Sequence, residues 1–295
     1  MLDGTQRLGR TMSKLLDLHQ RLVRKQLNKK GLKSCYHGSE GDRIHAYTYE
    51  GRDEGTPFVL IHGLGTHASA YAPLLTRLCP HAKSIIAPEL PGHGFSDLPR
   101  PIPSPKESFV RLARLLDSLI QEPTVIIGTS LGGAIALKYA LHSPEKVKAL
   151  FLVSPAGAPM SDAGMAHVRS LFDQTSAADG RKFLNQLFHR APWYTSLIGK
   201  PVQRLLSRPI VRTFVESDHQ QETLTPADVA KLKPPTMLLW GTSERILPSE
   251  CLDWYRGHMP KSVTIERPKD FGHSPHLEVP DSLTARILKF VETGT

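Results

Sequence analysis

The chain of 295 residues has few cysteines and no long apolar run, and each shortage excludes a class of protein. Its three cysteines are an odd number at wide spacing, so they do not form the disulfide framework of a small secreted domain. Its apolar runs are far shorter than the roughly 20 residues of a transmembrane helix, and its first ten residues lack the apolar core of a secretory signal. We therefore expect a globular protein in a reducing, cytoplasmic setting, with peripheral membrane association left open.

Motifs that bind metals or nucleic acids are also missing. The chain has 14 histidines, but no His-Glu-x-x-His pattern and no Cys-x-x-Cys pair occurs. The basic residues are not interleaved with aromatic side chains that could stack on bases. We therefore expect no metal, no cofactor and no nucleic-acid partner. The sequence does not indicate an oligomeric state.

The net charge of +9 is unevenly distributed, because much of it lies near the amino terminus. Residues 1–33, here called the leader, contain nine lysines and arginines against two aspartates. Seven of its apolar residues fall on one face at helical spacing and most of its basic residues on the opposite face, which predicts a basic amphipathic helix. These apolar residues are Leu8, Met12, Leu15, Leu16, Leu22, Val23 and Leu27. Such a helix lies on an anionic membrane, where each basic group adds about 1 kcal/mol, or packs on its own protein or a second subunit. Both interpretations stay open.

Beyond the leader, strand patterns alternate with helical patterns. Apolar runs typical of strands cover 43–50, 57–63, 83–90, 124–128, 148–153, 235–241 and 262–268. Helical patterns cover 69–78, 104–120, 131–143 and 282–292. The helix at 104–120 opens with Ser104, Pro105 and Glu107, which form a capping-box pattern. Strands that are apolar on both faces predict an α/β fold with a mostly parallel, doubly wound sheet covered by helices.

Residues 155–233 interrupt this alternation with helical sequence that proline and glycine punctuate. We interpret them as a helical cap inserted after the sixth strand. The predicted organisation is a basic helix at 1–33, a core made of 34–154 and 234–295, and a cap at 155–233. Apolar residues at helical spacing in the cap favour internal packing over a lipid channel, and its many basic residues are most simply a solvated surface.

Residues 128–132, with the sequence GTSLG, match the pattern Gly-x-Ser-x-Gly. They follow a buried strand and open a helix, which is the context in which this pattern exposes a nucleophilic serine. The glycines permit a sharp turn, and the amino terminus of the helix favours negative charge beside the serine. We interpret Ser130 as a nucleophile, the alternative being a tight turn with a capping serine.

A serine nucleophile needs groups that stabilise the oxyanion. The sequence HGLG at 62–65 ends a predicted strand, and the carboxyl ends of parallel strands gather at one edge of the sheet. The backbone of this segment can therefore face Ser130. We expect the backbone N–H groups of Leu64 and Leu131 to hold the oxyanion.

The nucleophile also needs a general base. His273 follows the last predicted strand, and the preceding Gly272 gives the backbone freedom to present its imidazole. His276 lies three residues further on and competes for the role. We favour His273, the alternative being that either histidine makes only a local hydrogen bond.

Together these motifs resemble those of the α/β-hydrolase family with a cap domain, over roughly residues 40–292. In that family a His-Gly pair follows the third strand, Gly-x-Ser-x-Gly follows the fifth, and a Gly-His followed by Glu-x-Pro comes last. The corresponding residues are His62-Gly63, Gly128 to Gly132, Gly272-His273, Glu278 and Pro280. The stretch 88–97 is similar to the loop after the family's fourth strand, which implies structural roles for His93 and Asp97.

The resemblance also implies an acid after the sixth or seventh strand. Residues 240–248, WGTSERILP, match the family's W-G-x-x-D-x-x-x-P pattern, except that Glu244 stands where Asp is usual. Both acids serve in such triads, where the carboxylate fixes the tautomer of the histidine and stabilises its cation. We expect Glu244 in this role. Asp162, the first carboxylate after the sixth predicted strand, is the alternative.

Serine as the nucleophile implies acyl transfer to water. The stretches 128–133 and 152–157 are similar to those of monoacylglycerol-lipase-like members, which implies an esterase or lipase acting on a small lipid-like ester without a cofactor. The same fold serves hydrolases that break carbon–carbon bonds in ring-cleavage products, and it also serves non-catalytic binding proteins. Both stay open as alternatives.

Overall fold

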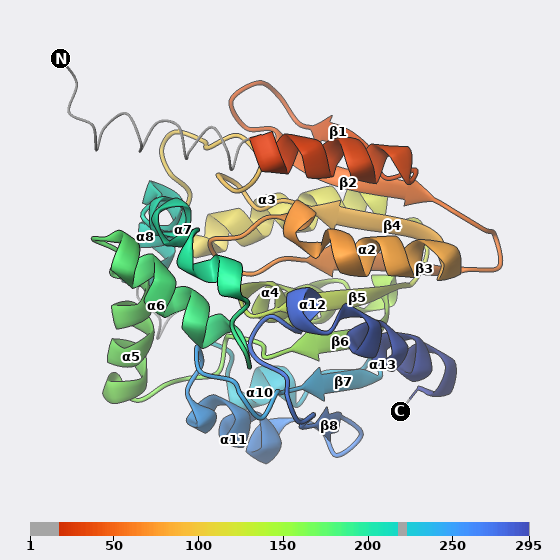
Figure 1. The fold of residues 1–295 in the computed structure, drawn as a ribbon. Coiled ribbons are helices and arrows are strands. Elements are labelled where there is room, and N and C mark those ends of the chain that lie inside the picture. The colour runs from red at the N-terminus through yellow and green to blue at the C-terminus, as the bar shows by residue number, and fades with distance from the viewer. Residues whose placement is uncertain (1–17, 218–222, 295) are drawn as a thin grey trace.

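The computed structural model describes residues 18–217 and 223–294, and its centre is one eight-stranded sheet (Figure 1). The strand order is β1-β2-β4-β3-β5-β6-β7-β8, in which β2 pairs antiparallel with β1 and β4 and all other neighbours are parallel. The strands are β1 (Lys33–His37), β2 (Ile44–Glu50), β3 (Thr56–Ile61), β4 (Ala82–Pro88), β5 (Thr124–Thr129), β6 (Val147–Val153), β7 (Thr236–Leu239) and β8 (Thr264–Glu266). The predicted α/β fold with a mostly parallel sheet is confirmed.

Two strands at opposite edges of the sheet differ most from the sequence-based prediction, and the inner strand β7 is also shorter than the predicted 235–241. Strand β1 was not predicted, because an edge strand with exposed and half-buried residues carries no continuous apolar run. Strand β8 is shorter than the predicted 262–268, and Pro268 two residues after its end cannot donate to a ladder. The differences at β1 and β8 lie at the edges of the sheet. A strand there has a neighbour on one side only and is less buried, which weakens its apolar sequence pattern.

Helices cover both faces of the sheet, and the side chains of the strands alternate between two cores. On β3, Val59 and Ile61 pack with α3 (Pro105–Leu119) and α4 (Leu131–His142), whereas Phe58 and Leu60 pack with α2 (Ala72–Leu78) and α13 (Pro280–Thr293). The capping box predicted at Ser104 is confirmed, with Ser104 and Glu107 each accepting a hydrogen bond from the other's backbone N–H. The helices outside the cap are η1 (Ala68–Tyr71), α2 (Ala72–Leu78), η2 (Cys79–His81), α3 (Pro105–Leu119), α4 (Leu131–His142), η3 (Pro144–Lys146), α11 (Ser249–His258), α12 (Pro275–Glu278) and α13 (Pro280–Thr293).

Between β6 and β7 the chain forms the helical insertion expected after the sixth strand. Helices α5 to α8 stand beyond the carboxyl ends of the parallel strands, toward which the arrowheads of β6 and β7 point (Figure 1). The insertion therefore covers the edge of the sheet where loops after parallel strands meet. Its elements are α5 (Asp162–Phe172), α6 (Ala177–Leu187), η4 (Trp193–Ser196), α7 (Gly199–Leu206), α8 (Pro209–Glu216) and α10 (Pro226–Val229).

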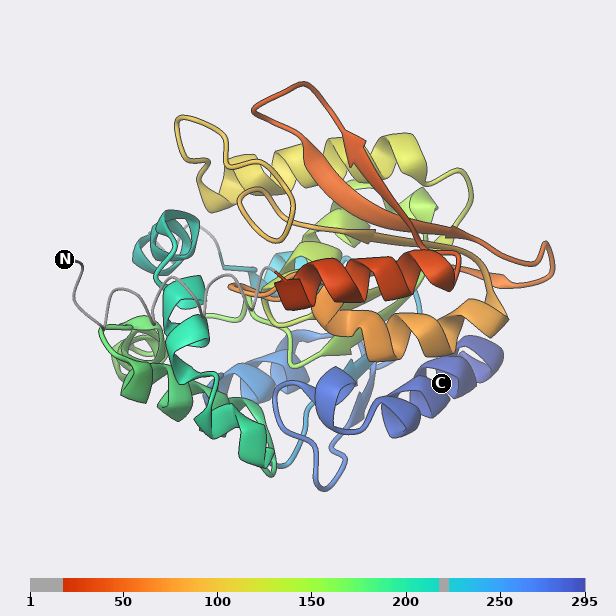
Figure 2. The same cartoon turned by 45° about the horizontal axis from the view of Figure 1, so that its top comes forward.

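The carboxyl-terminal part of the leader packs on the protein itself. Residues 18–29 form a helix that lies beside α2 in both views (Figures 1 and 2). Leu27 is 1% exposed and Val23 packs against the same core, whereas Leu18 and Leu22 are 51% and 48% exposed. The apolar stripe is thus buried at one end and exposed at the other. The helix was predicted over 1–33, but it ends before residue 30: residues 30–32 turn the chain and Lys33 begins β1. Residues 1–17 of the predicted helix lie outside the described residues.

We expect Leu27→Ala to lower the free energy of unfolding by about 2–5 kcal/mol, because it leaves a cavity between the leader and the core. The matched variant Leu22→Ala removes the same atoms from an exposed position and should change stability by less than about 0.5 kcal/mol. Urea denaturation followed by circular dichroism measures both. Equal stability of the two variants would show that residues 18–29 do not pack on the core.

Candidate active site

Ser130 occupies the turn between β5 and α4 in a backbone conformation that few residues adopt. Its φ and ψ angles are +56° and −121°. A residue other than glycine held in such a region costs about 1–3 kcal/mol, which the surrounding structure must supply. The Ser130 N–H donates to the carbonyl of Val153 (3.0 Å), and its own carbonyl accepts from the N–H of Ala156 (2.9 Å). The end of β6 therefore holds the strained turn in place.

Glycines let the turn approach its neighbours closely. A Cβ at Gly132 would lie 2.1 Å from the carbonyl oxygen of Ile61, and a Cβ at Gly128 would lie 2.4 Å from the carbonyl oxygen of Gly132. Only glycine fits at these two positions of the sequence pattern. Gly63, two residues after β3, makes a less severe but still tight approach, since a Cβ there would lie 3.3 Å from the Cβ of Ser130. The segment 62–65 thus lies against Ser130, as expected from the sheet edge.

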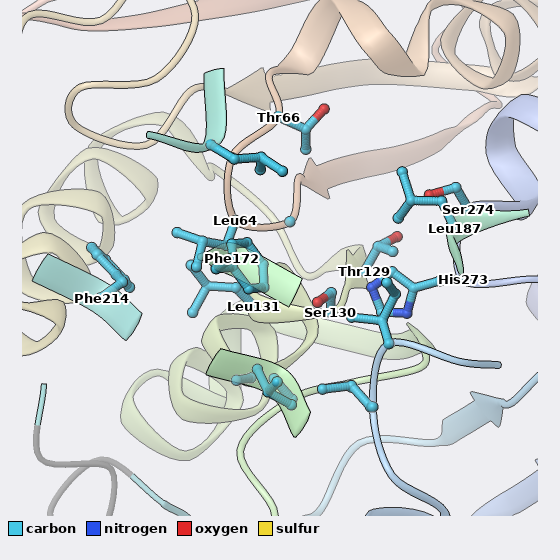
Figure 3. A pocket seen from close by; sticks show the side chains of 18 of the residues that line it. Leu64, Thr66, Thr129, Ser130, Leu131, Phe172, Leu187, Phe214, His273 and Ser274 are labelled. Carbon is cyan, nitrogen blue, oxygen red and sulfur yellow. The ribbon is translucent and has the colours of Figure 1, made fainter. Parts of the chain in front are cut away.

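Leu64 and Leu131, whose N–H groups we expected to hold an oxyanion, both line the cavity that contains Ser130 (Figure 3). Leu131 is the first residue of α4, where a backbone N–H has no acceptor within the helix and lies at the positive end of the helix dipole. Leu64 lies in the loop after β3, adjacent to Gly63. Both residues thus lie at the cavity of Ser130, and the role of their N–H groups as oxyanion donors stays a prediction.

Two buried histidines fix the loop that carries Leu64. The N–H of Gly65 donates to Nε2 of His93 (3.2 Å), and the N–H of Leu90 donates to Nε2 of His62 (3.0 Å). Burial lowers the pKa of His93 to about 3 and also lowers the pKa of His62. Each ring is therefore neutral and able to accept these bonds. His93 has the structural position that the sequence resemblance implied.

His273 and Glu244 form a buried pair. Nδ1 of His273 lies 2.7 Å from Oε2 of Glu244, and the two side chains are only 7% and 2% exposed. Oε1 of Glu244 accepts hydrogen bonds from the N–H groups of Ile246 (2.8 Å) and Leu247 (3.1 Å). Burial alone would raise the pKa of Glu244, but His273 and these bonds hold it below its ordinary value. The carboxylate is therefore ionised at neutral pH.

The competing residues lie elsewhere. His276 stacks on Tyr71 with ring centroids 3.8 Å apart, and burial, together with the neighbouring His273, lowers its pKa to about 3. Asp162 is the first residue of α5 and is exposed. The structure thus brings Glu244, and not Asp162, to His273. His276 lines the same cavity as Ser130, but its ring faces the tyrosine.

One residue beside this pair was not singled out from the sequence. Ser154 follows β6, is fully buried and has a φ of +40°. Its hydroxyl lies beside the Glu244 carboxylate and helps to lower that pKa, although it makes no hydrogen bond of ordinary geometry. The signal available was its place in the stretch 152–157, which resembles family members but does not reveal the contact.

A cavity of about 370 Å³ opens above Ser130 and His273, between the core and the cap (Figure 3). Most of its lining is apolar, and the cap contributes Phe172, Phe183, Leu184, Leu205, Leu206 and Phe214. Several of these side chains are also buried. The sequence analysis favoured internal packing of the cap over a lipid channel, but the same residues serve both: they pack within the cap and they line the cavity. The cavity suits a hydrocarbon chain better than a polar ligand.

Within residues 18–217 and 223–294, no group of three or more His, Cys, Asp or Glu side chains is placed to hold a metal ion. In the same part of the chain, no helix combines the length and the apolar character that crossing a membrane requires.

The comparisons with known proteins concern the family and the fold. The model of the alpha/beta hydrolase family matches residues 58–286. Lipase 1 of Psychrobacter immobilis is 27% identical over 277 residues, which cover 89% of this chain and 85% of that protein. The 2-hydroxy-6-oxo-2,4-heptadienoate hydrolase of Pseudomonas putida is 26% identical over 220 residues, covering 66% and 75%. The solved structure of a lipase-like protein of Acinetobacter baumannii has the same fold, with a TM-score of 0.79 at 21% identity over 93% and 96% of the two chains.

We expect Glu244→Gln to slow the reaction of Ser130 with a fluorophosphonate probe by roughly 10²–10⁴-fold, because the amide neither fixes the histidine tautomer nor stabilises its cation. The matched variant Asp162→Asn should react within about twofold of the wild type. Gel-based labelling over time gives both rate constants. A larger loss in Asp162→Asn than in Glu244→Gln would assign the acid to Asp162.

Proposed function

We propose that this chain, which belongs to the alpha/beta hydrolase family, cleaves carboxylic esters of medium or long acyl chains through Ser130, His273 and Glu244. Ester hydrolysis itself is what its lipase relative indicates, and the residues and the acyl preference are the proposal. The observation that carries it is the buried 2.7 Å contact between His273 and Glu244, at the same apolar cavity as Ser130.

The chemistry follows from this arrangement. Because Nδ1 of His273 faces Glu244, its Nε2 is the nitrogen that takes the proton of Ser130 as the hydroxyl attacks the ester carbonyl. The N–H groups of Leu64 and Leu131 hold the oxyanion, and the imidazolium then protonates the departing alcohol. Water repeats the sequence on the acyl-enzyme, with His273 again as the base, and releases the carboxylic acid.

The cavity supports an acyl group as the part of the substrate that it recognises. Its volume of about 370 Å³ lies in the range typical of small-molecule sites, and its wall from the cap is apolar. Each buried methylene contributes about 0.8 kcal/mol, so each carbon added to the acyl chain can lower KM by up to about fourfold while the chain still fits. We therefore propose that the substrate is a lipid-like ester, such as a monoacylglycerol.

A carbon–carbon bond hydrolase is the second candidate, because the Pseudomonas putida relative is named for a heptadienoate substrate. Such a substrate carries a carboxylate, which a cationic side chain would be expected to bind. Among the described residues that line the cavity, Lys138 is the one lysine or arginine that could bind this carboxylate. The rest of the lining is mostly apolar, so it provides few partners for a charged group of the substrate. A non-catalytic binding protein is the weaker candidate, because it would have no need of the buried His273–Glu244 pair.

An anionic membrane surface is the second partner that we propose. On the helix at 18–29, Leu18 and Leu22 are exposed together with Arg21 and Lys25. This combination of apolar and basic side chains is typical of helices that lie in a membrane interface. On the cap, Trp193 is 80% exposed, in a segment where residues 180–215 contain seven lysines and arginines and no acidic residue. Both surfaces suit a lipid interface with negative head groups.

For the substrate, we expect kcat/KM for p-nitrophenyl esters to rise about two- to fourfold per methylene from acetate until the cavity is filled, because each added methylene is buried. Steady-state kinetics over a series of acyl lengths measures this, with a vinylogous diketo acid as the comparison substrate. Faster turnover of the diketo acid than of every ester would favour the carbon–carbon hydrolase, and no turnover of either would favour a binding protein.

For the membrane, we expect the double variant Leu18→Asp, Leu22→Asp to lose most of its sedimentation with vesicles that contain phosphatidylserine. Its activity on p-nitrophenyl butyrate should equal that of the wild type, because both side chains are exposed away from the buried core. Vesicles of phosphatidylcholine alone serve as the control, since they lack the negative charge. Unchanged sedimentation of the variant would exclude the helix at 18–29 as the membrane contact.

A further inference from the structure

The end of helix α6 and the residues after it lie against both loops that carry the buried pair. This stretch, residues 185–190, is called here the cap segment. In Figure 3 its Leu187 is seen beside Ser274, the neighbour of His273. The cap segment belongs to the insertion, whereas both loops belong to the core, so these contacts are a junction between the two parts of the fold.

The first set of contacts is with the loop that carries Glu244. Nη1 of Arg245 donates to the carbonyl oxygens of Asn185 (3.2 Å) and Phe188 (3.4 Å). The carbonyl of Arg245 in turn lies 3.0 Å from Nε2 of His167 on α5. The residue directly after Glu244 is therefore held by the cap through its side chain and its backbone.

The second set of contacts is with the loop that carries His273. The N–H of Ser274 donates to the carbonyl of Leu187 (3.2 Å). A Cβ on Gly272 would lie 2.6 Å from that same carbonyl oxygen and 2.6 Å from the backbone nitrogen of His189, so only glycine fits. The residues on both sides of His273 thus touch the backbone of the cap segment. The sequence-based reason for Gly272, a freely rotating backbone, is replaced by this close approach.

Glu278 adds a further link between the cap segment and this loop. One of its carboxylate oxygens, Oε1, accepts a hydrogen bond from the N–H of Arg190 (3.2 Å). The other, Oε2, accepts from the N–H of Gly272 (3.1 Å). A single side chain therefore joins the cap backbone to the residue that precedes His273.

The side chain of His189 joins the two loops to each other. Its Nδ1 lies 2.6 Å from Oγ of Ser243, the residue before Glu244, and its Nε2 lies 3.1 Å from Oδ1 of Asp270, three residues before His273. A neutral ring protonated on Nε2 donates to Asp270 and accepts from the Ser243 hydroxyl. Asp270 has a φ of +63°, a conformation that needs support from its surroundings.

We propose that the cap segment positions the His273–Glu244 pair for the activation of Ser130, with His189 as the positioning residue. This inference depends on the proposed role of His273 as the base for Ser130. Catalytic groups must be held within a fraction of an ångström to act, and a displacement of 1 Å can cost about 10²-fold in rate. A backbone bond from Ser243 to Phe271 (3.0 Å) also joins the loops, so loss of His189 should have a partial effect.

We expect His189→Ala to lower both the rate constant for fluorophosphonate labelling and kcat for p-nitrophenyl acetate by about tenfold, with KM changed by less than about twofold. The short acetyl group fills little of the cavity. If His189 instead helped to bind the acyl chain, His189→Ala would raise KM for longer esters and leave p-nitrophenyl acetate unaffected. Lys182→Ala, an exposed position on α6, is the matched control and should match the wild type. An unchanged labelling rate in His189→Ala overturns the proposal.

A double-mutant cycle separates positioning from a merely structural role. If His189 acts through the pair, His189→Ala in a Glu244→Gln background should lower the labelling rate by less than about twofold, because the pair is already broken. A full tenfold further loss overturns the proposal. If His189→Ala does not fold, Ser243→Ala removes one of the two contacts of the ring and should show the same pattern of lowered kcat at constant KM.

The same experiment distinguishes failure of this inference from failure of the proposed function. Wild-type protein that neither reacts with the probe nor hydrolyses any ester would reject the serine-hydrolase function itself. Wild-type protein that reacts normally, together with a His189→Ala variant that reacts equally fast, would reject only the positioning role of the cap segment.

Discussion

The contact between the buried carboxylate of Glu244 and the imidazole of His273 is the interaction on which the rest of the site depends. Removing a carboxylate from water costs several kcal/mol unless charges and donors replace the lost hydration. Here His273 and the N–H groups of Ile246 and Leu247 supply that replacement. The loop after β7 must therefore keep one conformation, and the loop after β8 must bring the histidine to it.

The sheet meets this requirement by bringing distant segments together. In parallel strands the carboxyl ends lie at one edge, so the loops after β3, β5, β7 and β8 converge although up to about 200 residues separate them. Glycines then allow contact at backbone distance, at Gly132 against β3 and at Gly272 against the cap segment. The cap closes the same edge, so it both lines the cavity and contacts the loops of the buried pair.

The parts that could be predicted from the sequence are those set by local patterns. Buried strands form apolar runs, and the turn at Ser130 has the pattern Gly-x-Ser-x-Gly. The capping box at Ser104 depends on only three nearby positions, Ser104, Pro105 and Glu107. The edge strand β1 lacks such a pattern, and so do contacts between residues far apart, such as those of His189 with Ser243 and Asp270. The resemblance of 240–248 to a family pattern singled out Glu244, but only the fold places it 2.7 Å from His273.

The central claim is that Ser130 is a nucleophile activated by this pair, and mass spectrometry of the protein after reaction with a long-chain fluorophosphonate tests it most directly. The account predicts one adduct per chain, located on the peptide that contains Ser130 and absent from Ser130→Ala. The absence of an adduct on folded wild-type protein, or an adduct that persists in Ser130→Ala, would contradict it.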